Sequence, residues 1–360
     1  MSLCLEKLQL KDFRSYDTLE MSPDSKVTII VGPNAVGKTN ILEAVQLLTA
    51  ASSFRNPSWS ECVRWGAEQT SLLLKATGEG RVLETRLNIS AQGKRAYSVN
   101  GTLKRKIGEV TGILPSVVFT PDDLRMVKDS AERRRAAVDG VGDQLSTTYL
   151  SLRGEYERIV RQRNALLKTA NASRELAETL TERLRAHGEA FSAHRKRLFS
   201  RLSTEVSKTY GFLSPGEELE AVYQSSWVRR GLEEEGESSF AEALKLSEQE
   251  ERTRGVTLVG PHRDEIVFLV DGRDARTYAS QGQQRTIALA WKLAEVAVIT
   301  DVGAQPPILL LDDVMSELDE ARRHALTSLV GDKAQALVTT TNIGYFEPDM
   351  VSRASVVRLG

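Results

Sequence analysis

The sequence lacks the features of an exported or membrane-spanning protein. It has only two cysteines, Cys4 and Cys62, which form no C-x-x-C pair and suggest a reducing, cytosolic setting. No apolar run approaches the ~18 to 20 residues that a membrane span needs. Charged Glu6 and Lys7 stand where a signal peptide would need apolar residues. We therefore expect a cytoplasmic protein.

Proline is missing between about residues 130 and 207, where apolar residues recur at spacings of three and four. This pattern predicts a short antiparallel helical hairpin with ~25 residues in each arm. Net charge is −1, so only the distribution of charge can point to nucleic acid. Residues 153–201 hold 12 Lys/Arg against 6 Asp/Glu, whereas residues 217–254 hold 11 Asp/Glu against 5 Lys/Arg, with an acidic loop expected at 233–239. The basic helices are either a DNA-binding face, tested most directly at Arg195, Lys196 and Arg197, or an ordinary solvated face.

The most informative stretch is residues 27–39, VTIIVGPNAVGKT. Its β-branched start predicts a strand buried on both faces, and the residues after it have helical spacing. Gly32-x-x-x-x-Gly37-Lys38-Thr39 between such elements is the phosphate-cradling loop pattern, in which glycines let backbone amides curl around phosphate oxygens. Lys38 would reach the terminal phosphates of ATP, and the Thr39 hydroxyl would ligate Mg²⁺. The residues expected to bind nucleotide here are Gly32, Pro33, Asn34, Ala35, Val36, Gly37, Lys38, Thr39 and Asn40.

A second motif, residues 308–313, has four aliphatic residues that end in Asp312 and Asp313. The first acid at such a strand end holds Mg²⁺ in phosphate-loop proteins, and the second orients or deprotonates the attacking water. A strand followed by a polar turn is the common explanation for this pattern alone. Because the same chain contains a phosphate loop, we favour the interpretation that the two acids act on Mg²⁺ and water.

Ser280-Gln281-Gly282-Gln283-Gln284-Arg285 forms a third motif at an expected helix start, about 30 residues before the acids. Serine suits an N-cap, and glycine lets backbone amides approach an anion. Alone the motif would be a helix cap. At this spacing it resembles the signature motif of ABC-type ATPases, and residues 316–319 then fit the D-loop of that superfamily.

Strand-like segments surround these motifs. Asn100-Gly101 is a strong hairpin signal, so the strands before it predict an antiparallel sheet beside the nucleotide core. A long helix is expected from Ser280 and a shorter one at 320–329. The expected strands are 3–13, 71–76, 82–89, 95–99, 116–119, 256–259, 266–270, 276–278, 308–311, 336–340 and, as an edge, 356–359.

Taken together, the motifs resemble those of the RecF family of SMC-like recombination mediators. The similar stretches are Phe13-Arg14, GPNAVGKTNILEA, FTPDDL (119–124), GPHRDE (260–265), SQGQQR and LLLDD. The resemblance covers essentially the whole chain and implies an α/β ABC-ATPase-type head, in which a parallel phosphate-loop core joins an antiparallel β subdomain, with an inserted α-helical lobe. It also implies a homodimer that closes around ATP, binds DNA and works with RecR and RecO proteins to load recombinase at gaps or junctions, in repair, replication-fork recovery and SOS induction.

The resemblance assigns roles by position. Asp312 would assist Mg²⁺, Asp313 would position water, and Ser280, Gly282 and Gln283 would contact the ATP of the opposite subunit. Two departures from the wider ABC pattern are visible: residues 121–123 (PDD) stand where a glutamine metal sensor is expected, and residues 341–342 (TN) where a switch histidine is expected. The acid at 313 is also one methylene shorter than the usual glutamate. We therefore expect a slow, DNA-stimulated ATPase that acts as a switch.

Other ATPase classes fit less well. A transporter subunit would carry an LSGGQ-type signature, and a chromosome-structuring SMC protein would need arms of hundreds of residues, whereas ~25 residues per arm reach only about 35 to 40 Å. A metabolite kinase would lack the SQGQQR motif. The expected domains are 1–128 plus 255–360 for the head, and 129–254 for the helical lobe.

Overall fold

The computed structural model describes residues 3–78, 80–169, 173–228, 239–328 and 334–360. They form two compact units, Met1–Leu124 with Ala288–Gly360 and Arg125–Ile287. The expected return to the head at residue 255 is wrong. Residues 255–287 belong to the second unit, because the strand β10 (Glu265–Val270) pairs along its whole length with β9 (Leu219–Gln224).

The first unit contains a parallel sheet with strand order β14-β3-β13-β12-β8. Its central strands are apolar and β-branched and are buried along almost their whole length, as the sequence predicts for parallel strands. Every neighbouring pair runs parallel, so the carboxyl ends of β3 and β12 meet at one edge, with β13 between them. The strands are β3 (Val27–Val31), β8 (Ser116–Phe119), β12 (Ile308–Asp312), β13 (Ala336–Thr340) and β14 (Ser355–Arg358).

The same unit contains the predicted antiparallel sheet, with strand order β2-β1-β4-β5-β6-β7. The expected hairpin turn is confirmed, since Asn100 and Gly101 have φ of 49° and 76° between β6 and β7. Two strands of this sheet, β2 and β7, were not predicted, because both are mostly exposed and their sequences carry little apolar alternation. The strands are β1 (Cys4–Phe13), β2 (Tyr16–Met21), β4 (Gln69–Gly78), β5 (Arg81–Ser90), β6 (Arg95–Val99) and β7 (Thr102–Lys104).

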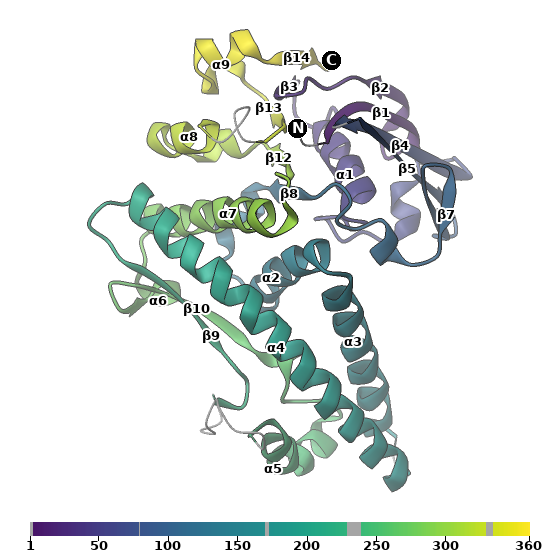
Figure 1. Ribbon diagram of the computed structural model, residues 1–360, viewed down its shortest axis with the longest axis vertical. Coiled ribbons are helices and arrows are strands. Elements are labelled where there is room, and N and C mark those ends of the chain that lie inside the picture. Colours follow the sequence, from purple (N-terminus) through teal and green to yellow (C-terminus); the bar gives the residue numbers. More distant parts are fainter. Residues whose placement is uncertain (1–2, 79, 170–172, 229–238, 329–333) are drawn as a thin grey trace. The chain divides into compact units, whose positions relative to one another are not determined.

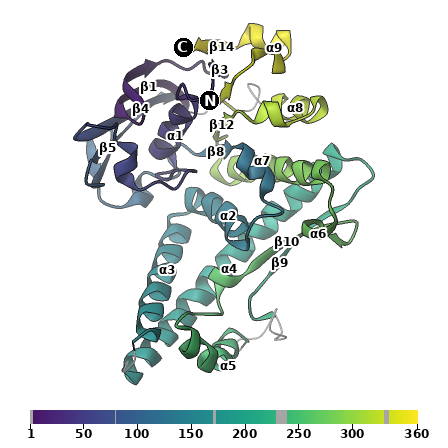
Figure 2. The same ribbon diagram turned by 180° about the vertical axis from the view of Figure 1, so that it is seen from behind.

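The helix α1 (Lys38–Thr49) contacts both sheets of the first unit (Figures 1 and 2). Its residues Ile41, Leu42, Val45 and Leu48 join a hydrophobic core with leucines of β1, β4 and β12. Because this packing holds α1 on two sides, the first turn of the helix is fixed at the edge where β3 ends. The other helices that lie wholly in this unit are α8 (Glu320–Thr327) and α9 (Pro348–Arg353).

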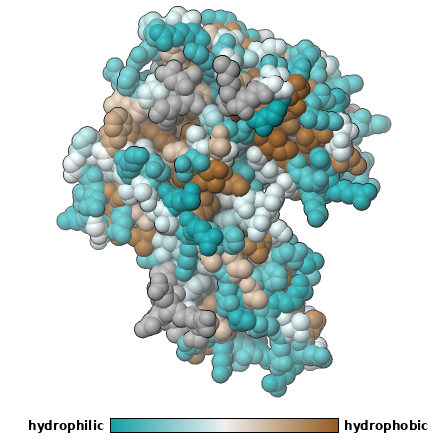
Figure 3. All heavy atoms as spheres, in the orientation of Figure 1, coloured by the Kyte–Doolittle hydropathy of each residue, from teal (hydrophilic) through white to brown (hydrophobic). Residues whose placement is uncertain are grey.

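The second unit is built on the predicted helical hairpin, formed by α3 (Thr147–Leu167) and α4 (Arg174–Leu213), which lie side by side in Figure 1. The arms have 21 and 40 residues, so the second is longer than predicted. Hydrophilic side chains cover most of the face of this hairpin seen in Figure 3, as expected for the exposed side of amphipathic helices. The remaining elements are α2 (Ala131–Leu145), α5 (Ser239–Arg254), α6 (Ala275–Tyr278), β9, β10, β11 (Arg273–Asp274) and the start of α7 (Gln281–Gly303).

Two strands predicted in the second unit are wrong. Residues 256–259 form no strand because helix side chains take their amides: Thr257 N–H donates to Asn164 Oδ1 and Leu258 N–H to Glu251 Oε1, both at 2.7 Å. Residues 276–278 lie in α6, whose first turn is capped by Asp274. The loop expected at 233–239 lies outside the described residues except for Ser239, which begins α5. No helix in the described ranges is long and apolar enough to cross a membrane.

Candidate nucleotide-binding site

The phosphate loop follows β3 and leads directly into α1. Lys38 is buried, and its Nζ donates to the carbonyl oxygens of Gly32 at 2.7 Å and Pro33 at 2.9 Å. Gly37 has φ of 104°, and a Cβ atom there would lie 2.8 Å from Ser15 Oγ, so glycine is required for two reasons. A Cβ atom at Gly32 would lie 2.6 Å from Leu359 O. Neighbouring atoms therefore pack closely against both glycines of the loop. The Lys38 ammonium binds the loop backbone, which a phosphate would approach.

A carboxylate lies beside the phosphate loop, in contact with Thr39. Asp312, at the end of β12, accepts hydrogen bonds on Oδ1 from the hydroxyls of Thr39 and Thr339, both at 2.8 Å. The described residues contain no cluster of three or more His, Cys, Asp or Glu side chains for an all-protein metal site. A single carboxylate and a hydroxyl are nevertheless what Mg²⁺ uses when phosphate oxygens and waters complete its shell. The oxygen ligands therefore fit Mg²⁺ together with a nucleotide.

Asp313 occupies a strained backbone position beside this pair. Its φ is 50°, and its N–H donates to the Thr339 hydroxyl at 3.0 Å. Its Oδ1 is buried and has no hydrogen-bond partner among the described residues. Burial raises the pKa of this carboxyl, against the opposing effect of the nearby Lys38 charge. An acceptor with unused capacity and a raised pKa suits a group that orients or deprotonates water.

A cluster of charged side chains at the start of α1 was not assigned a role from the sequence. Glu43 is fully buried and forms ion pairs with Arg14 at 2.7 Å and Arg55 at 3.2 Å. Arg55 also donates to Asn40 Oδ1 at 2.7 Å, which places a guanidinium next to the last expected loop residue. The three charges come from the end of β1, from α1 and from the loop after it. Because these residues are far apart in the sequence, no local pattern predicted that they would meet.

The two departures from the ABC pattern have local structural roles. Asp123 accepts from Thr120 N–H at 2.8 Å and lies 3.7 Å from the buried ammonium of Lys292. Asn342 uses Oδ1 to accept from Gly344 N–H at 2.8 Å. Both side chains therefore stabilise turns at the ends of their strands, β8 and β13.

The signature residues lie in the second unit, at the start of α7. Ser280 is the predicted N-cap, since its Oγ accepts from Gln283 N–H at 3.2 Å. Gln283 Oε1 accepts in return from Ser280 N–H at 2.9 Å, which completes a capping box. Gly282 follows in the first turn of the helix.

Known proteins with a related sequence or fold belong to one family of ATPases. Residues 4–357 fit the family described as RecF/RecN/SMC N terminal domain. The chain is 35% identical over 362 residues to a DNA replication and repair protein RecF from Bacillus thuringiensis (strain Al Hakam), covering 99% of this chain and 96% of that protein. The chain belongs to the RecF family. Its fold is that of the SMC/RecF ATPase head, an ABC-type fold.

Two solved structures support the same conclusion. They are described as the recombination mediator protein RecF-ATPrS and RecF-ATP in the RecFOR pathway. Each is 30% identical to this chain and covers 96% of it and 94% of its own chain, with TM-scores of 0.89 and 0.88. A RecF-family chain thus combines a phosphate loop, a paired Thr39–Asp312 and a capped signature helix.

The prediction that Arg195 binds DNA is wrong. This RecF-family chain buries the Arg195 side chain to 2% exposure, where it forms two hydrogen bonds with Asp139, at 2.9 and 2.7 Å, and one with Pro261 O at 2.6 Å. Lys196 is half-buried and lies over the ring of Trp227. Arg197 is exposed. DNA binding therefore stays a prediction for Lys196 and Arg197 alone.

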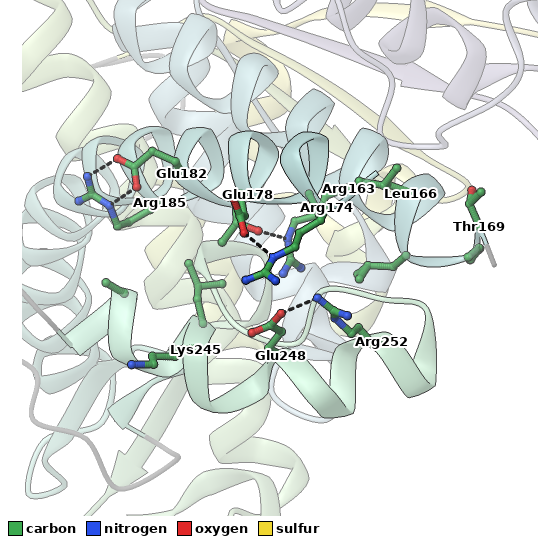
Figure 4. A pocket seen from close by; sticks show the side chains of 16 residues that line it. Arg163, Leu166, Thr169, Arg174, Glu178, Glu182, Arg185, Lys245, Glu248 and Arg252 are labelled. Carbon is green, nitrogen blue, oxygen red and sulfur yellow. Dashed lines mark hydrogen bonds and ion pairs between the residues drawn. The ribbon is translucent and has the colours of Figure 1, made fainter. Parts of the chain in front are cut away.

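A cavity of about 750 Å³ lies in the second unit, between α3, α4 and α5 (Figure 4). Its lining is rich in arginine, but Arg163 is buried against Glu251 at 2.6 Å, and other arginines pair with glutamates of their own helix. This compensation makes the cavity a poor anion site. The pairs drawn are Arg174–Glu178, Arg185–Glu182 and Arg252–Glu248.

Proposed function

We propose that the chain is an ATP-gated, DNA-binding homodimer that acts as a recombination mediator. The observation that carries this proposal is the contact between Thr39 and Asp312 beside the buried Lys38. It places a hydroxyl, a carboxylate and an ammonium together at the edge of a parallel sheet, which is the arrangement that binds Mg²⁺ and a nucleoside triphosphate. The relationship to RecF proteins supports the DNA-repair role.

The site residues divide the chemistry between them. Lys38 would exchange the Gly32 and Pro33 carbonyls for the β- and γ-phosphates, with backbone amides of residues 34–40 around the same oxygens. Thr39 and, directly or through water, Asp312 would hold Mg²⁺, which neutralises phosphate charge when bound. Asp313 would orient the attacking water through its unpartnered oxygen. An aspartate is shorter than the usual glutamate, and Asn342 is engaged in its turn, so we infer slow, DNA-stimulated hydrolysis.

The homodimer would use the signature helix. In a two-fold arrangement, Ser280, Gly282 and Gln283 of one subunit would approach the γ-phosphate bound by the other. The Ser280 oxygen accepts within its capping box, so its proton is available for a phosphate oxygen. ATP would then stabilise the dimer through contacts that ADP lacks, which is the differential affinity that a switch requires.

The DNA and protein partners follow from the family. The relatives are named as DNA replication and repair proteins, and the solved RecF structures are placed in the RecFOR pathway. We infer that this chain acts on duplex, single-stranded or junction DNA in the cytoplasm. It would help load recombinase with RecO- and RecR-type partners, in repair, fork recovery and SOS induction.

The experiment that tests this function combines two variants. Lys38→Met should lose ATP binding, whereas Ser280→Arg should bind ATP as a monomer but fail to dimerise. Equilibrium binding measures the ATP affinity of each variant, and sedimentation with ATP, ADP or no nucleotide, with and without duplex DNA, measures dimerisation. When the variants are mixed, one composite site contains both an intact Lys38 and an intact Ser280, so part of the ATPase turnover should return. If mixed dimers form without turnover, the shared site is excluded. Normal ATP affinity of Lys38→Met would overturn the assignment of the phosphate loop.

A further inference from the structure

A glutamate outside the three motifs contacts the signature helix. Glu217 lies in the turn between α4 and β9 and accepts from Gln283 Nε2 on Oε1 at 2.9 Å. Its other oxygen, Oε2, accepts from the hydroxyl of Tyr210 at 2.6 Å. One carboxylate therefore connects the last turn of the long helix α4 to the first turn of α7.

The charge of Glu217 decides how the Gln283 amide is oriented. A carboxylate can only accept, so it selects the NH₂ end of Gln283 and leaves Oε1 to face Ser280 N–H. The opposite orientation would put the Gln283 NH₂ against Ser280 N–H and its oxygen against a carboxylate. Glu217 thus stabilises the capping box that holds the Ser280 hydroxyl in place.

The groups that hold Glu217 are themselves fixed. Tyr210 has an exposed fraction of 0%. The turn that carries Glu217 is tied to the β10–β11 hairpin, because Glu218 N–H donates to Asp271 Oδ1 and Asp271 N–H donates to Glu218 O, both at 2.9 Å. The carboxylate has therefore little freedom to move independently of α4.

We propose that Glu217 is a positioning residue for the signature motif. From the end of α4, Glu217 fixes the orientation of the Gln283 amide and, through it, the position of the Ser280 hydroxyl. Glu217 uses both carboxylate oxygens to accept from protein side chains, Gln283 and Tyr210. It acts through Gln283, so displacement of the α4 end changes the fit of Ser280 to the ATP of a partner subunit. This inference rests on the proposed composite ATP site and adds the residue that couples the helical hairpin to it.

The test begins with Glu217→Gln, which keeps size but can no longer dictate the Gln283 orientation. We expect the dissociation constant of the ATP-bound dimer to rise about tenfold, the size of one charge-assisted hydrogen bond. The ATP affinity of the monomer should not change, since Glu217 lies in the other unit from the phosphate loop. Glu218→Gln is the matched control, because this exposed neighbour lies in the same turn. A purely structural role would instead lower the unfolding midpoint and leave the dimer constant of folded protein unchanged.

A side-chain exchange gives the sharper result. In the double variant Glu217→Gln/Gln283→Glu, the introduced amide at position 217 can accept from Tyr210 and donate to the introduced carboxylate at position 283. That carboxylate accepts from Ser280 N–H, as in the common S-x-x-E capping box. Residue 283 itself faces the partner's ATP in the proposed site, so the readout for this exchange is the cap and not the dimer. The Ser280 amide of the double variant should recover wild-type protection from hydrogen exchange, whereas Gln283→Glu alone places two carboxylates in contact and weakens the cap. Equal dimer constants for wild type and Glu217→Gln, or a double variant whose Ser280 amide is no better protected than in its parents, would overturn the inference.

Hydrogen exchange separates this inference from the proposed function. Without nucleotide, the Ser280 and Gln283 amides should exchange faster in Glu217→Gln than in wild type, with no such change in Glu218→Gln. This readout requires neither ATP nor a dimer. If wild type fails to dimerise with ATP but these amides respond, the proposed function fails and the positioning contact stands. If dimerisation behaves as proposed but the amides and the dimer constant do not respond, only the role of Glu217 is wrong.

Discussion

Both units of this RecF-family chain bury charge, but they use it differently. In the second unit, Arg195 is matched by both carboxylate oxygens of Asp139 and by the Pro261 carbonyl, and the Tyr149 hydroxyl adds a 2.6 Å bond to Asp139. In the first unit, Lys38 donates to backbone carbonyls, and one oxygen of Asp313 has no partner among the described residues.

This difference distinguishes a structural charge from one prepared for a ligand. A buried ion pair with every donor and acceptor satisfied has no capacity left for a partner molecule, and its disruption leaves an uncompensated charge. A buried acceptor without a partner is unfavourable in the empty protein and gains a bond when water or substrate arrives. The unpartnered Asp313 oxygen beside the Lys38 charge therefore distinguishes the proposed ATP site from the satisfied Arg195–Asp139 pair.

The largest effect is expected at Arg195, whose charge is fully paired in the interior of the second unit. Arg195→Ala should lower the free energy of unfolding of the second unit by about 3–5 kcal/mol, because Asp139 is left buried and unpaired. Thermal or denaturant unfolding measures this loss. The exposed Arg197→Ala, two residues away, should change stability by less than about 0.5 kcal/mol. Similar stabilities for the two variants would show that the Asp139 contact contributes little.

A second effect depends on pH. His262 accepts from Tyr156 at 2.6 Å and donates to Thr257 O at 3.1 Å, so the neutral ring satisfies both partners. Burial and the charges of nearby arginines lower its pKa from 6.5 to about 4. As pH falls from 6.5 towards 4, the unfolded chain gains a proton that the folded chain does not, so stability decreases by up to about 3 kcal/mol.

The variant His262→Gln isolates this contribution. Its amide can donate to Thr257 O and accept from Tyr156, but it does not titrate. We expect its free energy of unfolding to decrease less than that of wild type between pH 6.5 and 4, in denaturant titrations at each pH. Parallel curves for the two proteins would exclude His262 as the titrating group.

At the ATP site, Asp313→Asn should slow turnover about 10²-fold while ATP still binds. Asparagine tolerates the left-handed backbone that residue 313 adopts, so the change removes the charge with little strain. Single-turnover hydrolysis and the lifetime of the ATP-bound dimer measure the effect. An unchanged rate would mean that another group orients the water.

The smallest effect is expected at the surface of α4. Arg197→Glu should weaken DNA binding modestly and reduce the slope of log K against log salt by about 0.9 if Arg197 contacts one phosphate. Lys208→Glu, on the same helix, is a matched charge reversal outside the predicted trio. An unaltered slope for Arg197→Glu would assign Arg197 to the solvated face.

The sequence by itself determined the parts whose chemistry is local. The phosphate loop, the acids at 312–313 and the Ser280 cap depend on residues close in the chain, and the predicted strand β3, strand β12 and helix α7 all form around them. Apolar strands buried on both faces also indicate a parallel sheet, but the contact between Thr39 and Asp312 depends on the strand order β3-β13-β12, which no motif contains.

Only the tertiary structure decided which charges are satisfied. Arg195, Lys196 and Arg197 are neighbours in one basic run, yet helical geometry turns Arg195 into the interior and leaves Arg197 outside. The partners of Arg195 are 56 and 66 residues away, and Glu217 meets Gln283 across 66 residues. Residues 256–259 likewise have strand-like composition but bind helix side chains instead. Burial and pairing between distant segments depend on packing, which no local pattern contains.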